Sequence, residues 1–252
     1  MLKQIVEVKD ISKYFGTVAA VDHISFTVWP GEVLGLLGPN GAGKTTTIQL
    51  LLGLTTLTHG QIEILGMDIK TKRNEILQRV NFSSAYISLP SNLTVYENLV
   101  VFAKLYGIRH YRNKIMELLE FFDLLHILNS RTGMLSTGQM TRLNLTKSFI
   151  NDPEIIFLDE PTASLDPEVA SRVREKLKKI QIEKNVSMIY TSHNMNEVEL
   201  MCNRVLFIAN GKNVLEGTPK EIKEKSGSLE DVFISIARAT NFQINNCKDE
   251  RL

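Results

Sequence analysis

Apolar and polar residues alternate with a period of two near the N-terminus, which predicts the strands of an antiparallel sheet. The apolar positions of this pattern are Ile5, Val6, Val8, Ile24, Phe26 and Val28. Pro30-Gly31 then marks a turn, and the apolar run Val33–Leu37 leads through a glycine-rich loop into a helical stretch from Lys44 to about Leu52. A strand, a glycine loop and a helix in this order predict the first half of an α/β unit.

The pattern changes to a helical period between Thr94 and about Leu128. Apolar residues three or four positions apart form two stripes, Leu99, Phe102, Ala103 and Tyr106, then Ile115, Leu118, Leu119 and Phe122. Thr94 with Glu97 three residues later predicts a capping box. A further helix is expected from Ser136 to Ile150, so residues of about 90–150 form a helical segment.

After residue 150, patterns typical of strands and of helices again alternate along the chain, as in an α/β domain. Further strands are expected over 61–64, 79–82, 155–158 and 186–191, helices over 168–180 and 195–201, a hairpin over 205–208 and 214–216, and a last helix pair over 219–225 and 229–238. These patterns predict one α/β domain over 2–238 with a helical subdomain inserted at about 90–150. The polar tail, 239–252, is expected to be flexible.

Composition narrows the class of protein. Of 252 residues, 43% are hydrophobic and 23% charged, which excludes wholesale disorder. The net charge of +1 gives no basic excess, so no nucleic-acid partner is expected. Cys202 and Cys247 lack metal-ligand spacing and suit a reducing compartment. The N-terminus has no signal-peptide pattern and no apolar run is long enough to span a bilayer, which together predict a soluble, cytosolic chain.

The glycine-rich loop matches the phosphate-binding pattern G-x-x-x-x-G-K-[ST] in full. Its residues, with the threonine that follows, are Gly38, Pro39, Asn40, Gly41, Ala42, Gly43, Lys44, Thr45 and Thr46. Glycines let backbone N–H groups surround phosphate oxygens, Lys44 would reach the β- and γ-phosphates, and the Thr45 hydroxyl would bind Mg²⁺. A plain turn is the alternative, but the strand before and the helix after favour the phosphate site.

Two carboxylates follow an apolar strand at Asp159 and Glu160. In a P-loop fold, Asp159 suits a second Mg²⁺ contact and Glu160 suits a general base for the attacking water. A solvated strand end is the commoner explanation of such a pair when it stands alone. His193, which follows the strand over 186–191, would reach the same sheet edge and contact the γ-phosphate, unless it is a capping or packing residue.

A second candidate anion site opens the helix that begins after Leu135. Ser136 is a plausible N-cap, and that structural role suffices to explain it locally. The same helix end offers N–H groups, a hydroxyl and a favourable dipole to a phosphate. A dimer that places this helix end against its partner's nucleotide would explain two phosphate-binding helix ends in one chain.

The motifs GPNGAGKT, LSTGQ, IIFLDEP, ASLD and SH, in this order, resemble the nucleotide-binding subunit of ABC transporters over 2–238. The resemblance implies the ABC ATPase fold, α/β, with a P-loop NTPase core, an antiparallel β subdomain and an inserted α-helical subdomain. It implies that Gly38–Thr45 is the Walker A loop, that Asp159 and Glu160 are the Walker B aspartate and catalytic glutamate, and that His193 is the switch histidine. The resemblance also implies that Phe15 stacks on adenine, with a core or surface Phe as the alternative. It implies an ATP contact from Asp166 of the D-loop, and contacts in trans from the signature residues Ser136, Thr137, Gly138 and Gln139.

The sequence departs from the family pattern at two places. Thr137 replaces the first glycine of the signature, whereas Gly138, needed for close approach of phosphate, is kept. Alignment back from Leu93–Leu99, which resembles the family's LTVxENL, puts Ala85 where relatives carry a glutamine that touches Mg²⁺ and water. We therefore expect no direct Mg²⁺ ligand from residues 83–85.

The resemblance implies a Mg²⁺-dependent ATPase that dimerises, as a homodimer, around two ATP molecules. It would drive transport through separate membrane-spanning permease subunits, peripherally on the cytoplasmic side of the cell membrane. The segment Leu229–Phe233 resembles LEDVF ends of the exporter-like ABC-2 branch. The alternative is a soluble ABC-type ATPase for translation or DNA maintenance. Such relatives tend to carry paired ATPase domains, coiled-coil insertions or zinc modules, and this sequence has none. A regulator that does not hydrolyse ATP would lack Glu160 or His193, and both are present.

Overall fold

The structure is a computed structural model that describes residues 3–84 and 88–249, and its chain divides into two compact units. The first unit comprises Met1–Arg73 with Ile189–Leu252, and the second comprises Asn74–Met188. Helix α2 (Ile69–Arg79) and strand β8 (Ser187–Thr191) contain the two points of division.

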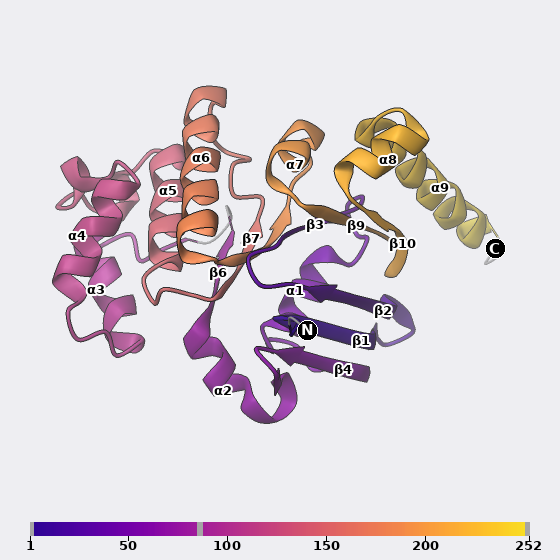
Figure 1. The fold of residues 1–252 in the computed structure, drawn as a ribbon, viewed down its shortest axis with the longest axis horizontal. Helices are drawn as coiled ribbons and strands as arrows, with labels where there is room; N and C mark the ends of the chain where they lie inside the picture. The colour runs from indigo at the N-terminus through magenta and orange to yellow at the C-terminus, as the bar shows by residue number, and fades with distance from the viewer. Residues whose placement is uncertain (1–2, 85–87, 250–252) are drawn as a thin grey trace. The chain divides into compact units, whose positions relative to one another are not determined.

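The first unit is built from strands and helices taken from both ends of the chain (Figure 1). Its elements are β1 (Val6–Phe15), β2 (Val18–Val28), β3 (Val33–Leu37), α1 (Lys44–Leu51), β4 (His59–Ile64), β5 (Met67–Asp68), α7 (Met195–Met201), β9 (Arg204–Ala209), β10 (Lys212–Gly217), α8 (Pro219–Ser226) and α9 (Leu229–Asp249). The second unit contains β6 (Val80–Ser84), α3 (Val95–Leu105), α4 (Tyr111–Phe121), α5 (Thr137–Ser148), β7 (Ile155–Asp159), α6 (Pro167–Lys184) and two short 3-10 helices, Leu125–Ile127 and Thr132–Met134.

The alternating pattern at the N-terminus forms the predicted antiparallel sheet. Its strands lie in the order β2-β1-β4-β5, and the register pairs Val6 with Val28 and Val8 with Phe26. Side chains on one face of β1 and β4 are buried, including Val6, Val8, Ile62 and Ile64, because successive residues of a strand point to opposite faces.

Strand β3 is buried along its whole length, which explains its uninterrupted apolar sequence. It pairs in parallel with β9, and β9 pairs antiparallel with β10 across a turn at Asn210-Gly211, as the predicted hairpin requires. The loop between β3 and α1 therefore starts at the carboxyl end of a buried parallel strand, which is where α/β folds bind ligands.

The second unit combines a parallel strand pair with helices. Strands β6 and β7 pair from Val80 with Ile155 to Ser84 with Asp159. Helix α5 packs on β6, and α3 and α4 lie side by side and both contact α5 (Figure 1). The helical segment expected at about 90–150 lies within this unit.

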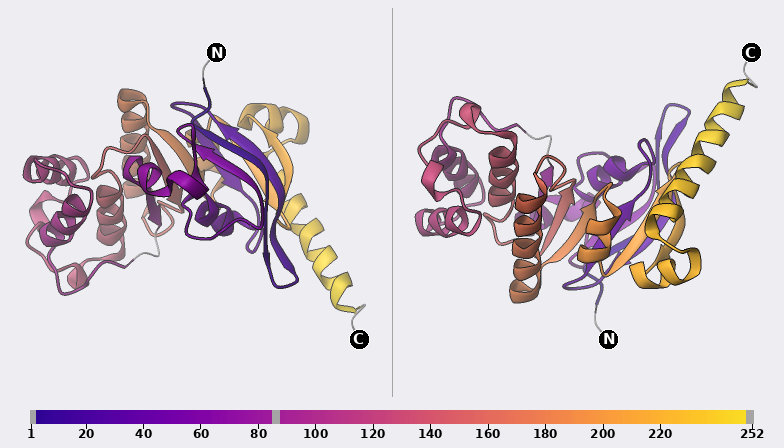
Figure 2. Two further views of the ribbon diagram at one scale, coloured as in Figure 1. Left: turned by 90° about the horizontal axis from the view of Figure 1, so that it is seen from below. Right: turned by 90° about the horizontal axis from the view of Figure 1, so that it is seen from above.

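Most predicted elements are confirmed, and the main differences among the described residues concern two helices, while β5 and the two short 3-10 helices were not predicted. Helix α2 was not predicted, because its apolar residues are few and give little periodic signal. Helix α9 continues to Asp249, beyond the predicted end at Arg238, since no glycine or proline interrupts it (Figure 2). Within the described residues, no helix is both long enough and apolar enough to cross a membrane.

Candidate functional site

The loop from Gly38 to Gly43 has a shape that only glycine permits at its two ends. The backbone φ angles are 148° at Gly38 and 105° at Gly43, in the region that side chains disfavour. A Cβ at Gly38 would overlap the carbonyl oxygen of Ile208, and one at Gly43 would overlap that of Ala20. The loop is therefore held against β9 and β2 by direct backbone packing, and the two outer glycines of the motif are structural requirements.

Helix α1 begins at Lys44 without a capping side chain. The N-cap is Gly43, so no capping side chain lies between the first turn of the helix and an anion that approaches it. The Lys44 ammonium lies within the loop, because Nζ donates to the carbonyl oxygens of Gly38 (2.7 Å) and Pro39 (3.0 Å). Gly41 and Thr45 are exposed, whereas Ala42 is buried. These features together form a positively polarised cradle that fits a polyphosphate.

The two candidate carboxylates follow the last residues of β7. Asp159 and Glu160 are both half-buried. Glu160 adopts φ of 52°, a left-handed conformation that is uncommon for residues other than glycine and that clusters at functional sites. In the parallel ladder Asp159 lies opposite Ser84, so the last residue of β6 lies beside this carboxylate. Ala85, where the family's glutamine is expected, lies outside the described residues.

His193 follows β8 and is exposed, whereas Thr191 and Ser192 before it are buried. The Ser192 hydroxyl donates to the Glu197 carboxylate (3.1 Å) and accepts from the Asn194 N–H (3.1 Å). Asn194 caps α7. This network fixes the backbone on both sides of the histidine and presents its imidazole at the end of the strand.

The signature segment forms the N-terminus of α5. The Ser136 hydroxyl accepts from the Gln139 N–H (3.3 Å), and the Gln139 side chain accepts from the Ser136 N–H (2.9 Å). The capping role considered from the sequence is therefore real. Ser136 and Thr137 are nevertheless exposed, so this helix end is accessible to another molecule.

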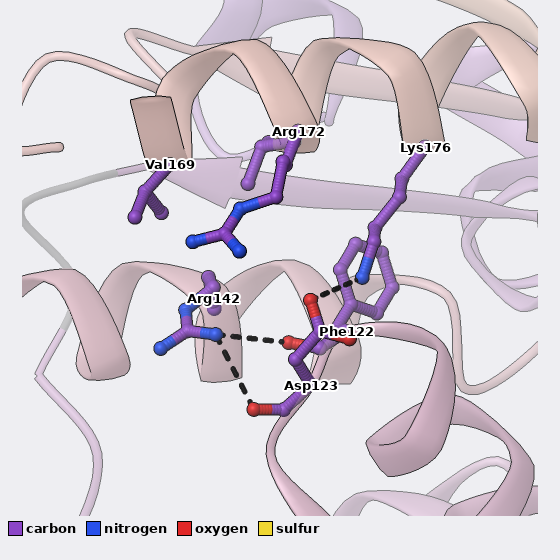
Figure 3. Close-up of a pocket in the computed structure, with 7 residues that line it drawn as sticks. Phe122, Asp123, Arg142, Val169, Arg172 and Lys176 are labelled. Atoms are coloured by element: carbon purple, nitrogen blue, oxygen red, sulfur yellow. Dashed lines mark hydrogen bonds and ion pairs between the residues drawn. The ribbon is translucent and has the colours of Figure 1, made fainter. Parts of the chain in front are cut away.

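A small pocket farther along α5 shows how this helix is anchored (Figure 3). Arg142 of α5 donates to the carbonyl oxygens of Phe122 and Asp123 at the end of α4. Lys176 of α6 pairs with the Asp123 carboxylate at 2.5 Å (Figure 3). Positive charges near the carboxyl end of a helix stabilise it. These contacts therefore hold α4, α5 and α6 together and anchor the helix that begins at the predicted signature segment.

Two further predicted site residues have local partners. The Asp166 carboxylate caps α6 by accepting from the Val169 N–H (3.0 Å). Phe15 is 52% exposed, and the Lys13 ammonium lies 5.0 Å from its ring centroid. A ring this exposed at the end of β1 is open to stacking by a ligand.

The described residues lack a clustered metal site, and the thiol of Cys202 is unreactive. Among the described residues, no group of three or more His, Cys, Asp or Glu side chains has the arrangement of a metal cluster. Cys202 is buried, and burial raises the pKa of its thiol well above the usual range, so it is not a reactive nucleophile.

Two residues near these motifs were not assigned a role from the sequence. Lys147 on α5 is buried, and burial lowers its pKa to about 8. Phe233 on α9 lies against His193, with ring centroids 6.3 Å apart. For Lys147, the sequence offered its position within the helix predicted over 136–150. The contact between the Phe233 and His193 rings joins distant segments, and sequence spacing does not reveal such a contact.

Known proteins are similar to this chain in sequence and in fold. The family model described as ABC transporter matches residues 21–163. The chain is 39% identical over 241 residues to the probable multidrug ABC transporter ATP-binding protein YbhF of Escherichia coli strain K12, covering 92% of this chain and 41% of the relative. It is 37% identical over 221 residues to the Nod factor export ATP-binding protein I of Burkholderia pseudomallei strain 1710b, covering 87% of this chain and 72% of the relative.

A solved structure of the ATP-binding subunit of an ABC transporter matches with a TM-score of 0.84 and 27% identity, over 92% of this chain and 99% of that chain. The expected fold class is thus confirmed. The chain spans less than half of the length of the Escherichia coli relative. A match to the family model over more than half of the chain, together with identity above 30% to both relatives, shows that this chain is an ATP-binding cassette of the ABC transporter family.

Proposed function

We propose that this chain is the ATP-hydrolysing subunit of an ABC exporter. The observation that carries the proposal is the loop between β3 and α1, with its glycine-only conformations, its uncapped helix end and the Lys44 ammonium held inside it. The names of the two relatives, a multidrug transporter component and a Nod factor export component, support export rather than a role outside transport. The translation or DNA-maintenance alternative is therefore not favoured.

The proposed reaction is in-line attack of water on the γ-phosphate of ATP. Residues 2–238 would act as one ATPase domain. Lys44 would bind the β- and γ-phosphates, Glu160 would accept a proton from the attacking water, and His193 would orient the γ-phosphate. Phe15 would stack on adenine, which its exposure supports.

Mg²⁺ is the metal that the residues fit. Thr45 is exposed in the first turn of α1 and Asp159 ends β7, so each offers a hard oxygen donor of the kind that Mg²⁺ prefers. These two residues would hold the ion, which would neutralise charge on the phosphate oxygens when bound. Ser83 and Ser84 are buried at the end of β6, and no direct ligand is expected from them.

A second copy of the chain is the proposed partner at the signature. The exposed Ser136 and Thr137 would contact the γ-phosphate held by the partner's loop, with Gly138, Gln139 and Asp166 completing that contact. Separate membrane-spanning subunits would supply the transport path. The chain would then associate with the cytoplasmic side of the membrane through them, and no nucleic acid would be involved.

The test compares ATP binding and phosphate release in three variants of the purified chain. Glu160→Gln should keep ATP binding and lower hydrolysis by about 10²–10⁴-fold, because the amide cannot accept a proton. Lys44→Ala should weaken ATP binding by roughly ten- to a hundredfold, because it removes a charge-assisted contact. Glu168→Gln, which makes the same change at an exposed position of α6, should behave like the parent. A parent that releases no phosphate, alone or with its co-purified membrane protein, would overturn the proposal.

A further inference from the structure

The segment Leu229–Phe233 opens helix α9, and its last residue contacts the switch histidine. The rings of Phe233 and His193 lie 6.3 Å apart between centroids, with an interplanar angle of 78°. This edge-to-face arrangement is a preferred geometry for aromatic pairs. The function proposed above makes no use of α9, so the contact calls for an explanation of its own.

The backbone around His193 is fixed independently of this contact. Besides the bonds of Ser192, the Tyr190 hydroxyl bonds to the Glu197 carboxylate at 3.3 Å, and Glu197 is 6% exposed. Asn194 starts α7 immediately after the histidine. The backbone on both sides of His193 is therefore fixed, and the orientation of its imidazole depends on χ1 and χ2.

Phe233 is presented from an element that is itself well anchored. Leu229 is fully buried, and the Ser228 hydroxyl both accepts from the Asp231 N–H (3.0 Å) and donates to the Asp231 carboxylate (2.6 Å). Helix α9 packs on α8 and β9, and Lys223 of α8 pairs with Glu199 of α7 at 3.1 Å. The half-buried Phe233 ring is thus held by its own helix and lies against the imidazole of His193.

We infer that Phe233 is a positioning residue for His193, and that the first turns of α9 thereby take part in ATP hydrolysis. The inference rests on the proposed function, because it assumes that His193 orients the γ-phosphate. Phe233 would act only by limiting the orientations of the imidazole, through the ring contact. Its loss should slow hydrolysis without changing how tightly ATP binds.

The direct test is an NMR spectrum of the histidine rings in the full chain. The sequence contains five histidines, and the signal that disappears in His193→Ala identifies the residue of interest. Phe233→Leu should shift that signal, because the ring current of the phenyl group is lost, and should leave the other four in place. Ile234→Ala, which changes the exposed next residue of the same helix, should leave all five in place.

The kinetic test separates positioning from folding. Phe233→Leu should lower kcat about three- to tenfold, the range expected for loss of one aromatic pair, with KM for ATP unchanged. Phe233→Tyr keeps the ring and should restore kcat, whereas Ile234→Ala should match the parent. In a His193→Ala background, Phe233→Leu should cause no further loss, because its effect passes through the histidine.

The possible results distinguish failure of the ATPase proposal from failure of the positioning proposal for Phe233. A parent chain without phosphate release contradicts the ATPase proposal, and the NMR experiment still tests the ring contact. If the parent is active and Phe233→Leu keeps both the parent's kcat and the parent's His193 signal, the positioning role is overturned. A loss of kcat that is equally large in the His193→Ala background would make Phe233 merely structural.

Discussion

At the scale of single residues, Lys147 of the second unit is a basic side chain that is almost fully buried. Its side chain is 7% exposed, its ammonium donates to the Phe82 carbonyl at 3.4 Å, and it lies 5.4 Å from the ring centroid of Phe102. One carbonyl and one ring face replace lost hydration only in part, so the pKa falls to about 8. Lys147 thereby joins α5, which begins at the predicted signature segment, to β6.

The lowered pKa of Lys147 predicts a pH dependence of stability. Between about pH 8 and 10.5 the unfolded chain keeps a proton on this lysine that the folded chain has released, so the free energy of unfolding rises with pH. Lys147→Met removes this contribution. The difference in free energy of unfolding between parent and variant should therefore shift in favour of the parent, by on the order of 3 kcal/mol, across that window.

Denaturant unfolding at several pH values measures this difference. Lys104→Met, a change at an exposed lysine of α3, corrects for the general effect of removing a positive charge. A parent–variant difference that stays constant from pH 8 to 10.5 would show that the buried ammonium is not destabilised by the fold.

At the scale of elements, α3 and α5 begin with the same kind of capping box but are expected to have different functions. Thr94 and Glu97 form a capping box at α3, and Ser136 and Gln139 form one at α5. Each box satisfies two N–H groups that a helix start would otherwise leave without partners. Only the second lies in a signature-like segment, so the pair offers an internal control for separating capping from catalysis.

Thr94→Ala and Ser136→Ala should each lower the free energy of unfolding by about 1 kcal/mol, because each removes a capping hydroxyl. Hydrolysis should fall only in Ser136→Ala, by roughly tenfold or more, through loss of a hydrogen bond to a charged phosphate. Ser136→Asp should keep the cap and the stability yet lose activity, since a carboxylate repels the γ-phosphate. Thermal unfolding and phosphate release measure the two effects; equal activity in Thr94→Ala and Ser136→Ala would assign Ser136 to capping alone.

At the scale of the whole molecule, the proposed active unit is a pair of chains. The exposure of Ser136 and Thr137 leaves the start of α5 available to a partner, while the loop at Gly38–Thr45 belongs to the other unit of the same chain. If each nucleotide is held by the loop of one chain and the signature of the other, damage to the two motifs should complement between chains.

Mixing a Ser136→Arg chain with a Lys44→Ala chain tests this directly. In the mixed dimer both changes fall on one nucleotide site and the second site is intact. Phosphate release by the mixture should exceed that of either variant alone. A mixture whose activity is only the average of two inactive proteins would argue against a shared site, and Ser136 would then serve its own helix.

The sequence by itself determined most of the order of elements, though not α2, and it determined which residue types the motifs carry, because both depend on local patterns. Alternation of apolar residues specified β1 and β2, the uniformly apolar Val33–Leu37 specified a buried strand, and Thr94 with Glu97 specified a helix start. The loop Gly38–Thr45 was recognisable because phosphate binding requires glycines and a lysine at fixed spacing.

Tertiary structure alone decided which distant residues meet. The pairing of Ser84 with Asp159 brings the end of β6 beside the Asp159 carboxylate, and no spacing in the chain encodes that register. The low pKa of Lys147 arises from burial by other elements, and the contact of Phe233 with His193 joins segments from different elements. Local patterns report only neighbours within one helix or strand, whereas burial and ring contacts depend on how the elements pack in space.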